Sequence, residues 1–488
     1  MNNSDKICFV FDNQLTEIDF TKSEFRPSTT LLNYLRSLPT HKGVKEGCAE
    51  GDCGACTVVI AELNQQNQLE YKALDSCLVF LPMIHGKQII TIENLEQIVN
   101  KELKLHPVQQ LMVENNGSQC GYCTPGIVMS LFALFKNHHQ PEKEVIEDAL
   151  TGNLCRCTGY KPIIEAAEKS CCNHGNDHFT EKQYEIIEML LSINENKKSI
   201  SLLHKEQEYF LPLNLKDALE FKKLYPNAVV ISGATDTALR QTKKGEIIPQ
   251  LIDLSQIEEL KHFTKNNNSI EIGAGLTLEK AKNEVENIFP ALFDILKVFG
   301  SLQIRNIATI GGNIGSASPI GDTLTFLFAC KAFVKLQNLT SVRKVAIEDF
   351  IIGYRKTDTN ADELITAVEI PLIPENVIIK SYKVSNRKDL DISTVSASFR
   401  LQLSNKNSVE EIIIAFGGMA AYTIRASKTV TYLIDKTWNR NTVEEAMEVL
   451  KTEFSPISDA RAEKDYRAMA AANLLLKFWS EISLNQKD

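Results

Sequence analysis

The chain has 488 residues, of which 43% are hydrophobic and 24% charged, and its formal net charge is -9. At roughly 150 residues per domain, this length indicates about three domains. The acidic balance argues against sequence-independent nucleic-acid binding, which needs an excess of Lys and Arg. No apolar stretch approaches the roughly 20 residues that cross a bilayer, which argues against a membrane protein.

The amino-terminal residues lack the charged start and the apolar core of an export signal, so the expected compartment is the reducing cytoplasm. In that compartment the twelve cysteines are expected to be metal ligands or redox groups rather than disulfides.

The first 95 residues are predicted to form a small α+β unit. Apolar residues alternate on both sides of Asp12-Asn13, a pattern typical of a β-hairpin. A helix is expected at 31–38, before Pro39, and strand-like runs follow at 57–60 and 88–92.

The apolar period becomes helical after residue 95. Short helical runs with cysteines in their connections indicate a four-helix bundle that holds a cofactor between helix ends; they are 107–112, 127–135, 145–150 and 162–169. The polar stretch from 173 to 205 is interpreted as a linker that contains one helix.

The rest of the chain is predicted to form two further domains. Residues 206–379 alternate strand-like and helical segments, the mark of an α/β domain. Residues 380–488 contain strand-like runs at 395–403 and 411–416, which are expected to pair, and then two helical runs. The predicted fold class is therefore multidomain α+β, with no internal repeat.

A first set of cysteines has the spacing C-x4-C-x2-C followed by one distant cysteine. This is the plant-type ferredoxin arrangement for a 2Fe-2S cluster, and its members are Cys48, Cys53, Cys56 and Cys77. Gly47, Gly51 and Gly54 would allow a positive-φ backbone whose amides point at sulfur. The alternative is structural zinc, which usually takes two short pairs well apart in sequence.

A second set places C-x2-C about thirty residues before C-x-C; its members are Cys120, Cys123, Cys155 and Cys157. Alone, two separated pairs would also suit zinc. Beside the first set, a second 2Fe-2S cluster is favoured. Two adjacent one-electron carriers would form an electron-transfer chain. Such a chain needs a two-electron cofactor at one or both ends.

Two segments suggest a flavin as that cofactor. Residues 230–237 start as a buried strand and continue in small polar residues that can bring amides against a pyrophosphate, although such a pattern is more often an ordinary strand end. Residues 299–322 are rich in small and polar residues, and Gly311-Gly312 permits close approach of the backbone to a ligand. The absence of G-x-G-x-x-G argues against a Rossmann-type site.

The amino-acid sequence around these motifs is similar to that of the molybdenum hydroxylase family. The stretches that carry the resemblance are Gly121-Tyr122-Cys123-Thr124-Pro125-Gly126, Asn153-Leu154-Cys155-Arg156-Cys157-Thr158-Gly159-Tyr160, and Ile304-Arg305-Asn306 with Ala308-Thr309-Ile310-Gly311-Gly312-Asn313. The resemblance implies a ferredoxin-like (β-grasp) 2Fe-2S domain at 1–95, a helical 2Fe-2S domain at 96–172, a linker at 173–205, a family-type FAD-binding domain at 206–379 and a flavoprotein domain at 380–488.

The resemblance also implies roles for particular residues. The bundle cluster would lie nearest molybdopterin, with Gln119 beside the pterin and Cys157 on the molybdenum side, and the ferredoxin-like cluster would lie nearest the flavin. The implied flavin contacts are Val230, Ile231, Ser232, Gly233, Ala234, Thr235, Asp236, Thr237, Phe299, Thr309, Ile310, Gly311, Gly312, Asn313, Asp322, Ile365 and Lys383. Ala234 stands where several relatives carry Asn. Ile365 could equally be an ordinary sheet residue without a flavin contact, and Lys383 could equally be an ordinary surface residue.

The function implied is that of an electron-transfer subunit. Because the chain ends at Asp488, molybdopterin is expected on a separate large subunit that oxidises a purine such as xanthine. Electrons would pass through two 2Fe-2S clusters to FAD, which reduces NAD, in a heterodimer or a dimer of heterodimers. The cofactors supply the chemistry, so no catalytic residue is nominated. The alternatives are an aldehyde or N-heterocycle hydroxylase, another acceptor such as a quinone or oxygen, and a non-catalytic iron-sulfur carrier.

Overall fold

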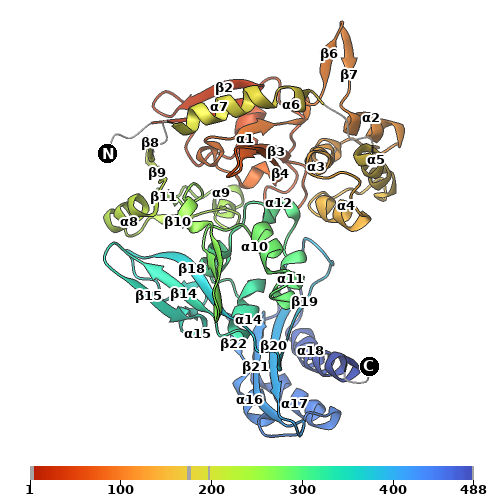
Figure 1. Ribbon diagram of the computed structural model, residues 1–488, viewed down its shortest axis with the longest axis vertical. Helices are drawn as coiled ribbons and strands as arrows, with labels where there is room; N and C mark the ends of the chain where they lie inside the picture. Colours follow the sequence, from red (N-terminus) through yellow and green to blue (C-terminus); the bar gives the residue numbers. More distant parts are fainter. Residues whose placement is uncertain (1–4, 173–176, 196–197, 486–488) are drawn as a thin grey trace. The chain divides into compact units, whose positions relative to one another are not determined.

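The computed structural model describes residues 5–172, 177–195 and 198–485 (Figure 1). Its contacts divide the chain into two compact units, Met1–Glu258 with Gly300–Ala308, and Glu259–Phe299 with Thr309–Asp488. The predicted fold class, multidomain α+β, is confirmed, whereas the domain limits stay predictions. Among the described residues, no helix combines the length and the apolar character that crossing a bilayer requires.

The first unit begins with a five-stranded mixed sheet in the order β2-β1-β5-β3-β4. Its strands are β1 (Lys6–Phe11), β2 (Gln14–Asp19), β3 (Thr57–Leu63), β4 (Leu69–Asp75) and β5 (Gln88–Ile90). The predicted hairpin is confirmed: Asp12 and Asn13 take φ values of 51° and 58°, as a tight hairpin turn requires. Helix α1 (Leu31–Ser37) is N-capped by Thr30. Short 3-10 turns follow β4, at Ser76–Leu78 and Leu81–Ile84, and β5, at Ile92–Asn94.

The predicted bundle helices are α2 (Pro107–Glu114), α3 (Thr124–Asn137), α4 (Lys143–Leu150) and α5 (Lys161–Cys172). Helix α3 is buried at every position from Gly126 to Phe135 and packs against β3 and β4, so it joins the bundle to the ferredoxin-like sheet. A hairpin of β6 (Gln97–Val99) and β7 (Glu102–Lys104), which the sequence did not predict, precedes α2.

The predicted linker is partly helical and partly outside the described residues. Residues 173–176 and 196–197 are not described. Between them lie α6 (His178–Glu181) and α7 (Gln183–Glu195). Ile186 and Leu190 of α7 pack with Val10 of β1, so the predicted linker helix lies against the first sheet.

A second, four-stranded sheet completes the first unit, in the order β10-β11-β9-β8. Its elements are β8 (Ile200–His204), β9 (Gln207–Leu211), α8 (Leu215–Leu224), β10 (Val229–Ile231), α9 (Ala238–Thr242) and β11 (Gln250–Asp253), together with α12 (Leu302–Arg305) from further along the chain. Strands β10, β11 and β9 are parallel. Phe20 and Leu78 share one hydrophobic core with Tyr209 and Leu251, so the two sheets of this unit form a continuous body. A 3-10 turn, Glu258–Leu260, spans the boundary of the units.

The second unit contains an antiparallel sheet in the order β12-β13-β18-β14-β15. Its elements are β12 (Phe263–Lys265), β13 (Ser269–Gly273), α10 (Leu278–Val285), α11 (Pro290–Lys297), α13 (Ile310–Ser316), α14 (Asp322–Ala329), β14 (Phe333–Gln337), β15 (Val342–Ala346), α15 (Ile347–Phe350), β16 (Ile351–Gly353), β17 (Lys356–Thr357) and β18 (Leu364–Pro371). The alternation of strand-like and helical segments predicted for residues 206–379 is seen here, for example in β13 followed by α10.

A four-stranded antiparallel sheet and three helices close the second unit. They are β19 (Val377–Val384), β20 (Val395–Leu403), β21 (Val409–Gly417), β22 (Ile424–Arg425), α16 (Ser427–Leu433), α17 (Arg440–Glu453) and α18 (Lys464–Asn485). The predicted pairing of 395–403 with 411–416 is confirmed. Phe399 and Phe416 on the sheet pack with Leu450 of α17 and Phe478 of α18 in one core.

Candidate metal and cofactor sites

The first cysteine set lies in the loop before β3 and in the turn after β4. Cys48 contacts Cys53, and Cys56 contacts Cys77. Cys56 and Cys77 are buried, whereas the other two are half-buried. The amides of Glu50 and Asp52 donate to Cys48 Sγ at 3.4 and 3.2 Å, as expected for a loop that points amides at sulfur.

Two of the three predicted glycines of this loop take positive φ, Gly51 at 74° and Gly54 at 66°. Gly47 does not. It is closely packed instead, because a Cβ there would lie 2.8 Å from Cys53 Sγ. The expectation of positive φ at Gly47 is therefore wrong.

The second cysteine set lies before α3 and between α4 and α5. Cys120 contacts Cys157, and Cys123 contacts Cys155. Thr158 Oγ1 lies 3.1 Å from Cys155 Sγ. Both members of the first pair are exposed, so this set reaches the surface of the described chain. Gln119 beside it is exposed as well.

Contact within the pairs changes the acidity of the thiols. The sulfur of Cys48 accepts a hydrogen bond from Cys53, and this lowers the pKa of Cys48 to about 6 and raises that of Cys53. A backbone amide at Tyr122 and the thiol of Cys157 lower the pKa of Cys120. Burial raises the pKa of Cys123 to about 12, and its contact with Cys155 acts in the same direction. Metal ligation requires thiolates. The lowered pKa values of Cys48 and Cys120 favour the thiolate form at these two positions.

The pairing bears on which metal the thiols suit. Across 5–172, 177–195 and 198–485, no three or more Cys, His, Asp or Glu side chains are grouped as one metal ion would require. A 2Fe-2S centre needs two thiolates on each of two irons, and each set presents two contacting pairs. Each donor set therefore has the composition that a diiron centre needs.

The two cysteine loops are hydrogen-bonded to one another. The backbone amide of Leu154 donates to the carbonyl oxygen of Cys53 at 3.1 Å. The side chain of Asn153 donates to the Gly54 carbonyl oxygen, also at 3.1 Å. The sequence indicated that both sets bind metal, but Asn153 was not recognised as the residue that joins them.

The first cysteine loop also contacts the part of this unit that follows the linker. Lys243, just after α9, donates to the Cys48 carbonyl oxygen at 3.1 Å and lies 3.2 Å from Glu50. A Cβ at Gly51 would lie 2.9 Å from Ile304 of the 300–308 segment. That segment in turn touches the predicted flavin loop, because a Cβ at Gly233 would lie 1.8 Å from the Ile307 carbonyl oxygen.

Part of the polar segment 299–322 serves to dock the bundle. Gln303 and Arg305 are fully buried. Gln303 donates to the Ala149 carbonyl oxygen at 3.0 Å, and Arg305 donates to both oxygens of Asp148 at 2.7 and 2.8 Å. Gln303 and Arg305 are therefore polar because they bind α4, and not because they contact a cofactor.

The predicted flavin loop, residues 230–237, begins at β10 and reaches α9. Ala234 takes a positive φ of 58°, and Ser232 Oγ is buried with no hydrogen-bond partner among the described residues. The loop follows the carboxyl end of a parallel strand, where open α/β sheets bind ligands. An unpartnered hydroxyl and a left-handed turn fit a ligand with hydrogen-bonding oxygens, such as the pyrophosphate of FAD.

The remaining predicted flavin contacts belong to the second unit. Thr309 caps α13 and accepts from the Gly312 amide at 3.1 Å. A Cβ at Gly311 would lie 2.5 Å from that of Ala274, so packing within this unit also restricts the position to glycine. Gly312 has open space apart from Thr309. Asn313 Oδ1 accepts from Thr323 at 2.5 Å.

Asp322 and Lys383 come together in this unit. Their side chains form a 2.9 Å ion pair and are 6% and 5% exposed. Ser393 donates to the other oxygen of Asp322 at 2.5 Å, and Lys383 also donates to the Val298 carbonyl oxygen at 3.1 Å. The alternative interpretation of Lys383 as a surface residue is therefore wrong. Phe299 is half-buried at the end of α11.

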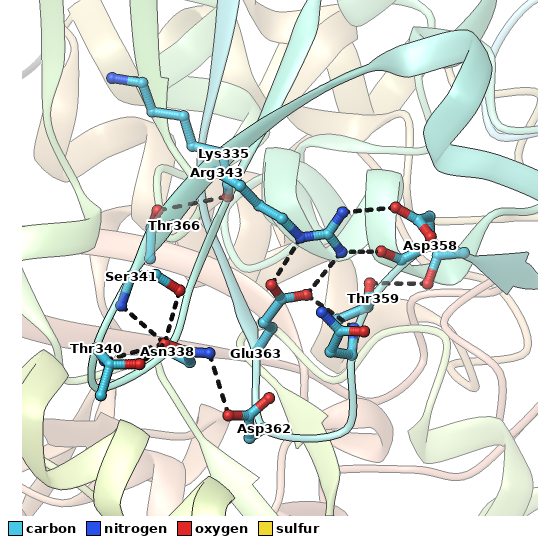
Figure 2. Close-up of polar contacts among 12 residues, drawn as sticks. Lys335, Asn338, Thr340, Ser341, Arg343, Asp358, Thr359, Asp362, Glu363 and Thr366 are labelled. Atoms are coloured by element: carbon cyan, nitrogen blue, oxygen red, sulfur yellow. Dashed lines mark hydrogen bonds and ion pairs between the residues drawn. The ribbon is translucent and has the colours of Figure 1, made fainter.

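Ile365 lies on β18 and approaches α13, because a Cβ at Gly315 would lie 3.2 Å from its Cδ1. Figure 2 shows how the start of this strand is held: the guanidinium of Arg343 binds Glu363 through two bonds of 2.7 and 2.8 Å and reaches Asp358 at 2.6 Å. Glu363, which is buried, has a lowered pKa because it accepts these bonds. The network fixes the strand two residues before Ile365.

A cavity of about 470 Å³ opens beside Lys383. It is lined by α11, by the end of β19 and by the loop that follows it, and its charged lining residues are Asp294, Lys383, Arg387 and Lys388. Lys383 is paired with Asp322, and Arg387 lies 3.7 Å from Asp391. Arg387 and Lys388 are cations that can contact an anionic group of a ligand.

Three family models match along the chain. A 2Fe-2S binding domain matches residues 91–168, the FAD binding domain in molybdopterin dehydrogenase matches 204–373, and the CO dehydrogenase flavoprotein C-terminal domain matches 380–482. The xanthine dehydrogenase of Emericella nidulans is 31% identical over 93% of the chain, and the xanthine dehydrogenase/oxidase of Gallus gallus is 30% identical over 93%. The chain spans 37% and 38% of the lengths of these curated relatives.

Solved structures share the fold of part of this chain. A chain of carbon monoxide dehydrogenase from Hydrogenophaga pseudoflava aligns with a TM-score of 0.53 at 21% identity, over 56% of this chain and 96% of that chain. A chain of quinoline 2-oxidoreductase from Pseudomonas putida 86 aligns with a TM-score of 0.52 at 23% identity, over 56% and 95%. At these identities the likeness concerns the fold alone.

Proposed function

Because the chain belongs to the molybdenum hydroxylase family, we propose that it carries electrons through two 2Fe-2S centres to FAD. The proposed ligands of the centres are the two cysteine sets. The proposed FAD contacts are 230–237, Phe299, 309–313, Asp322, Ile365 and Lys383. When bound, the clusters would pass single electrons and the flavin would exchange them singly or in pairs.

The observation that carries this proposal is a continuous series of contacts within the first unit. The second cysteine loop is hydrogen-bonded to the first through Leu154 and Cys53. The first loop packs on Ile304, and the segment that contains Ile304 packs on Gly233 of the flavin loop. The contacts therefore run from the second cysteine set to the first and then to the predicted flavin loop, which is the order that the proposed electron transfer requires.

The proposed partner is a molybdopterin-bearing polypeptide that oxidises the substrate. Exposure of Cys120, Cys157 and Gln119 supports docking of that partner at the second set. The relatives named xanthine dehydrogenase favour a purine as substrate. Likeness in fold to a quinoline 2-oxidoreductase and a carbon monoxide dehydrogenase keeps other substrates as the second candidate. We propose a heterodimer or a dimer of heterodimers in the reducing cytoplasm.

The proposed acceptor of the electrons is NAD. The cavity beside Lys383 presents Arg387 and Lys388, cations that suit a pyrophosphate. A quinone or oxygen, which carries no such phosphates, would make no use of them. A role as an iron-sulfur scaffold is disfavoured because a scaffold needs no flavin cradle.

Metal and flavin analysis of the purified chain tests the proposal. We expect about four irons and one FAD per chain, and anaerobic NADH should bleach the visible absorbance. Zinc in place of iron would contradict electron transfer through two 2Fe-2S centres. Full iron and FAD without bleaching by NADH would contradict the proposal that NAD is the electron acceptor. Co-purification of a molybdenum protein, with a xanthine and NAD assay of the complex, tests the substrate.

A further inference from the structure

Asn153 occupies the junction of the two cysteine loops. Its side chain is 2% exposed and donates to the Gly54 carbonyl oxygen and to Thr57 Oγ1, both at 3.1 Å. Its side-chain oxygen, Oδ1, accepts from Ser130 Oγ at 2.6 Å and from Gln303 Nε2 at 3.1 Å. Both ends of the amide are therefore satisfied, which fixes the orientation of the side chain.

The loops approach so closely only because two positions lack a side chain. A Cβ at Gly54 would lie 2.2 Å from the Gly152 carbonyl oxygen and 2.5 Å from Asn153 Nδ2. A Cβ at Gly126 would lie 2.0 Å from the Gly54 carbonyl oxygen. Distances below about 3 Å exclude any Cβ at either position, so the close junction is specified by the sequence.

A bonded route between the two cysteine sets passes through this junction. It runs from Cys53 Sγ along its own backbone to the carbonyl oxygen, across the 3.1 Å hydrogen bond to the Leu154 amide, and along the backbone to Cys155 Sγ. Asn153 immediately precedes Leu154 and is anchored to Gly54, which follows Cys53. The Asn153–Gly54 bond therefore helps to hold the Leu154 amide against the Cys53 carbonyl oxygen.

We infer that Asn153 is a positioning residue that sets the electronic coupling between the two iron-sulfur centres. The inference rests on the proposed function. When both centres are bound, an electron lost by the centre at the second set would be gained by the centre at the first, and Asn153 would hold the hydrogen bond between their cysteine loops. Hydrogen bonds outside the ligand shell commonly orient metal ligands in this way.

Two variants of Asn153 and one control test the inference. N153A removes the whole amide, and N153D keeps its size and acceptor oxygen but cannot donate to Gly54. The matched control is N137A. Asn137 at the end of α3 donates to the Tyr71 carbonyl oxygen at 2.7 Å, so it also joins the bundle to the ferredoxin-like sheet, but away from the cysteines.

The readout is the spin-spin splitting between the two centres in the low-temperature paramagnetic resonance spectrum of the fully reduced chain, with iron content measured in parallel. We expect both Asn153 variants to keep both signals and four irons but to show a smaller splitting, because the through-bond exchange contribution falls while the through-space dipolar part remains, and N137A to keep the full splitting. Unchanged splitting in both Asn153 variants would overturn the inference, as would an equal reduction in N137A. Loss of a whole centre in both Asn153 variants would also overturn it, by assigning Asn153 to cluster retention. Absence of two centres from the wild-type chain would instead overturn the proposed function.

Discussion

The ammonium of Lys383 lies 2.9 Å from the carboxylate of Asp322, and both side chains are almost completely buried. The two residues come from β19 and from the start of α14. Ser393 donates to the second carboxylate oxygen, so Asp322 fixes both ends of the loop between β19 and β20. Both members of the pair were predicted as flavin contacts, and removing either one would leave an uncompensated buried charge.

Replacement of Lys383 by methionine is expected to lower both stability and flavin content. The substitution leaves the carboxylate of Asp322 buried with Ser393 as its remaining donor, at a cost of about 3–5 kcal/mol. Thermal unfolding measures the first effect, and the ratio of FAD to iron measures the second. Iron should stay constant, because the cysteines belong to the other unit. The control is K380M, three residues earlier on β19 and so on its opposite face; equal loss of FAD in K380M would contradict the assignment.

Replacement of Cys157 by serine should remove one centre and leave the other. The purified variant is expected to contain about two irons instead of four, because the first cysteine set is intact. Cys172 provides the control, since it is also exposed and ends α5 but has no predicted ligand role. The iron content per chain of C157S and C172S tests this prediction. A C157S chain with four irons, or a C172S chain that lacks iron, would exclude the predicted ligand set.

Substitutions at Ala234 should separate backbone strain from flavin binding. Ala234 takes a φ of 58°, a conformation that Asn tolerates and β-branched residues do not. We expect A234V to lower the free energy of unfolding by about 1–2 kcal/mol, whereas A234N should retain stability and bind FAD at least as tightly. Urea denaturation and FAD titration are the measurements. Equal stability of A234V and the wild type would show that this turn is not required in solution.

The Arg343–Glu363 pair should make stability depend on pH in the acid range. The pKa of Glu363 is held below its ordinary 4.5, first by hydrogen bonds from Arg343. The unfolded chain therefore binds the proton more readily. The contribution of the pair is fully present above pH 4.5 and is lost as the pH falls through the lower folded pKa.

R343M tests this dependence. Because Arg343 is about one-third exposed, we expect a loss of only about 1–2 kcal/mol near neutral pH. The difference between the variant and the wild type should shrink as the pH falls below the folded pKa of Glu363. Urea unfolding over a pH series measures it, and a difference that stays constant into acid would rule out the carboxylate as its source.

The sequence predicted the parts of the molecule whose causes are local. The hairpin follows from Asp12-Asn13 between alternating apolar residues, and the cysteine sets follow from spacing, because ligands of one centre must lie near one another. The hairpin β6–β7 was missed because its turn is Asn100-Lys101, with φ values of 53° and 70°. Asp and Asn favour such left-handed turns, but Lys does not, so the sequence marks this turn weakly.

The residues that join separate segments could not be predicted. Asn153 looks like an ordinary loop residue, and its partners come from the loop before β3, from α3 and from the 300–308 segment. Gln303 and Arg305 gave their segment a polar character that resembles a cofactor cradle, but they dock the bundle. Ser393 lies 71 residues from Asp322. Such contacts depend on tertiary packing, which a single sequence does not reveal.

Paramagnetic resonance of the dithionite-reduced chain, with the spins quantified, tests the central claim most directly. The account predicts two distinguishable rhombic signals, each integrating to about one spin per chain, because each cysteine set would hold one 2Fe-2S centre. A single signal, or none from a chain that contains iron, would contradict the assignment of two centres and with it the route from the second cysteine set to the flavin.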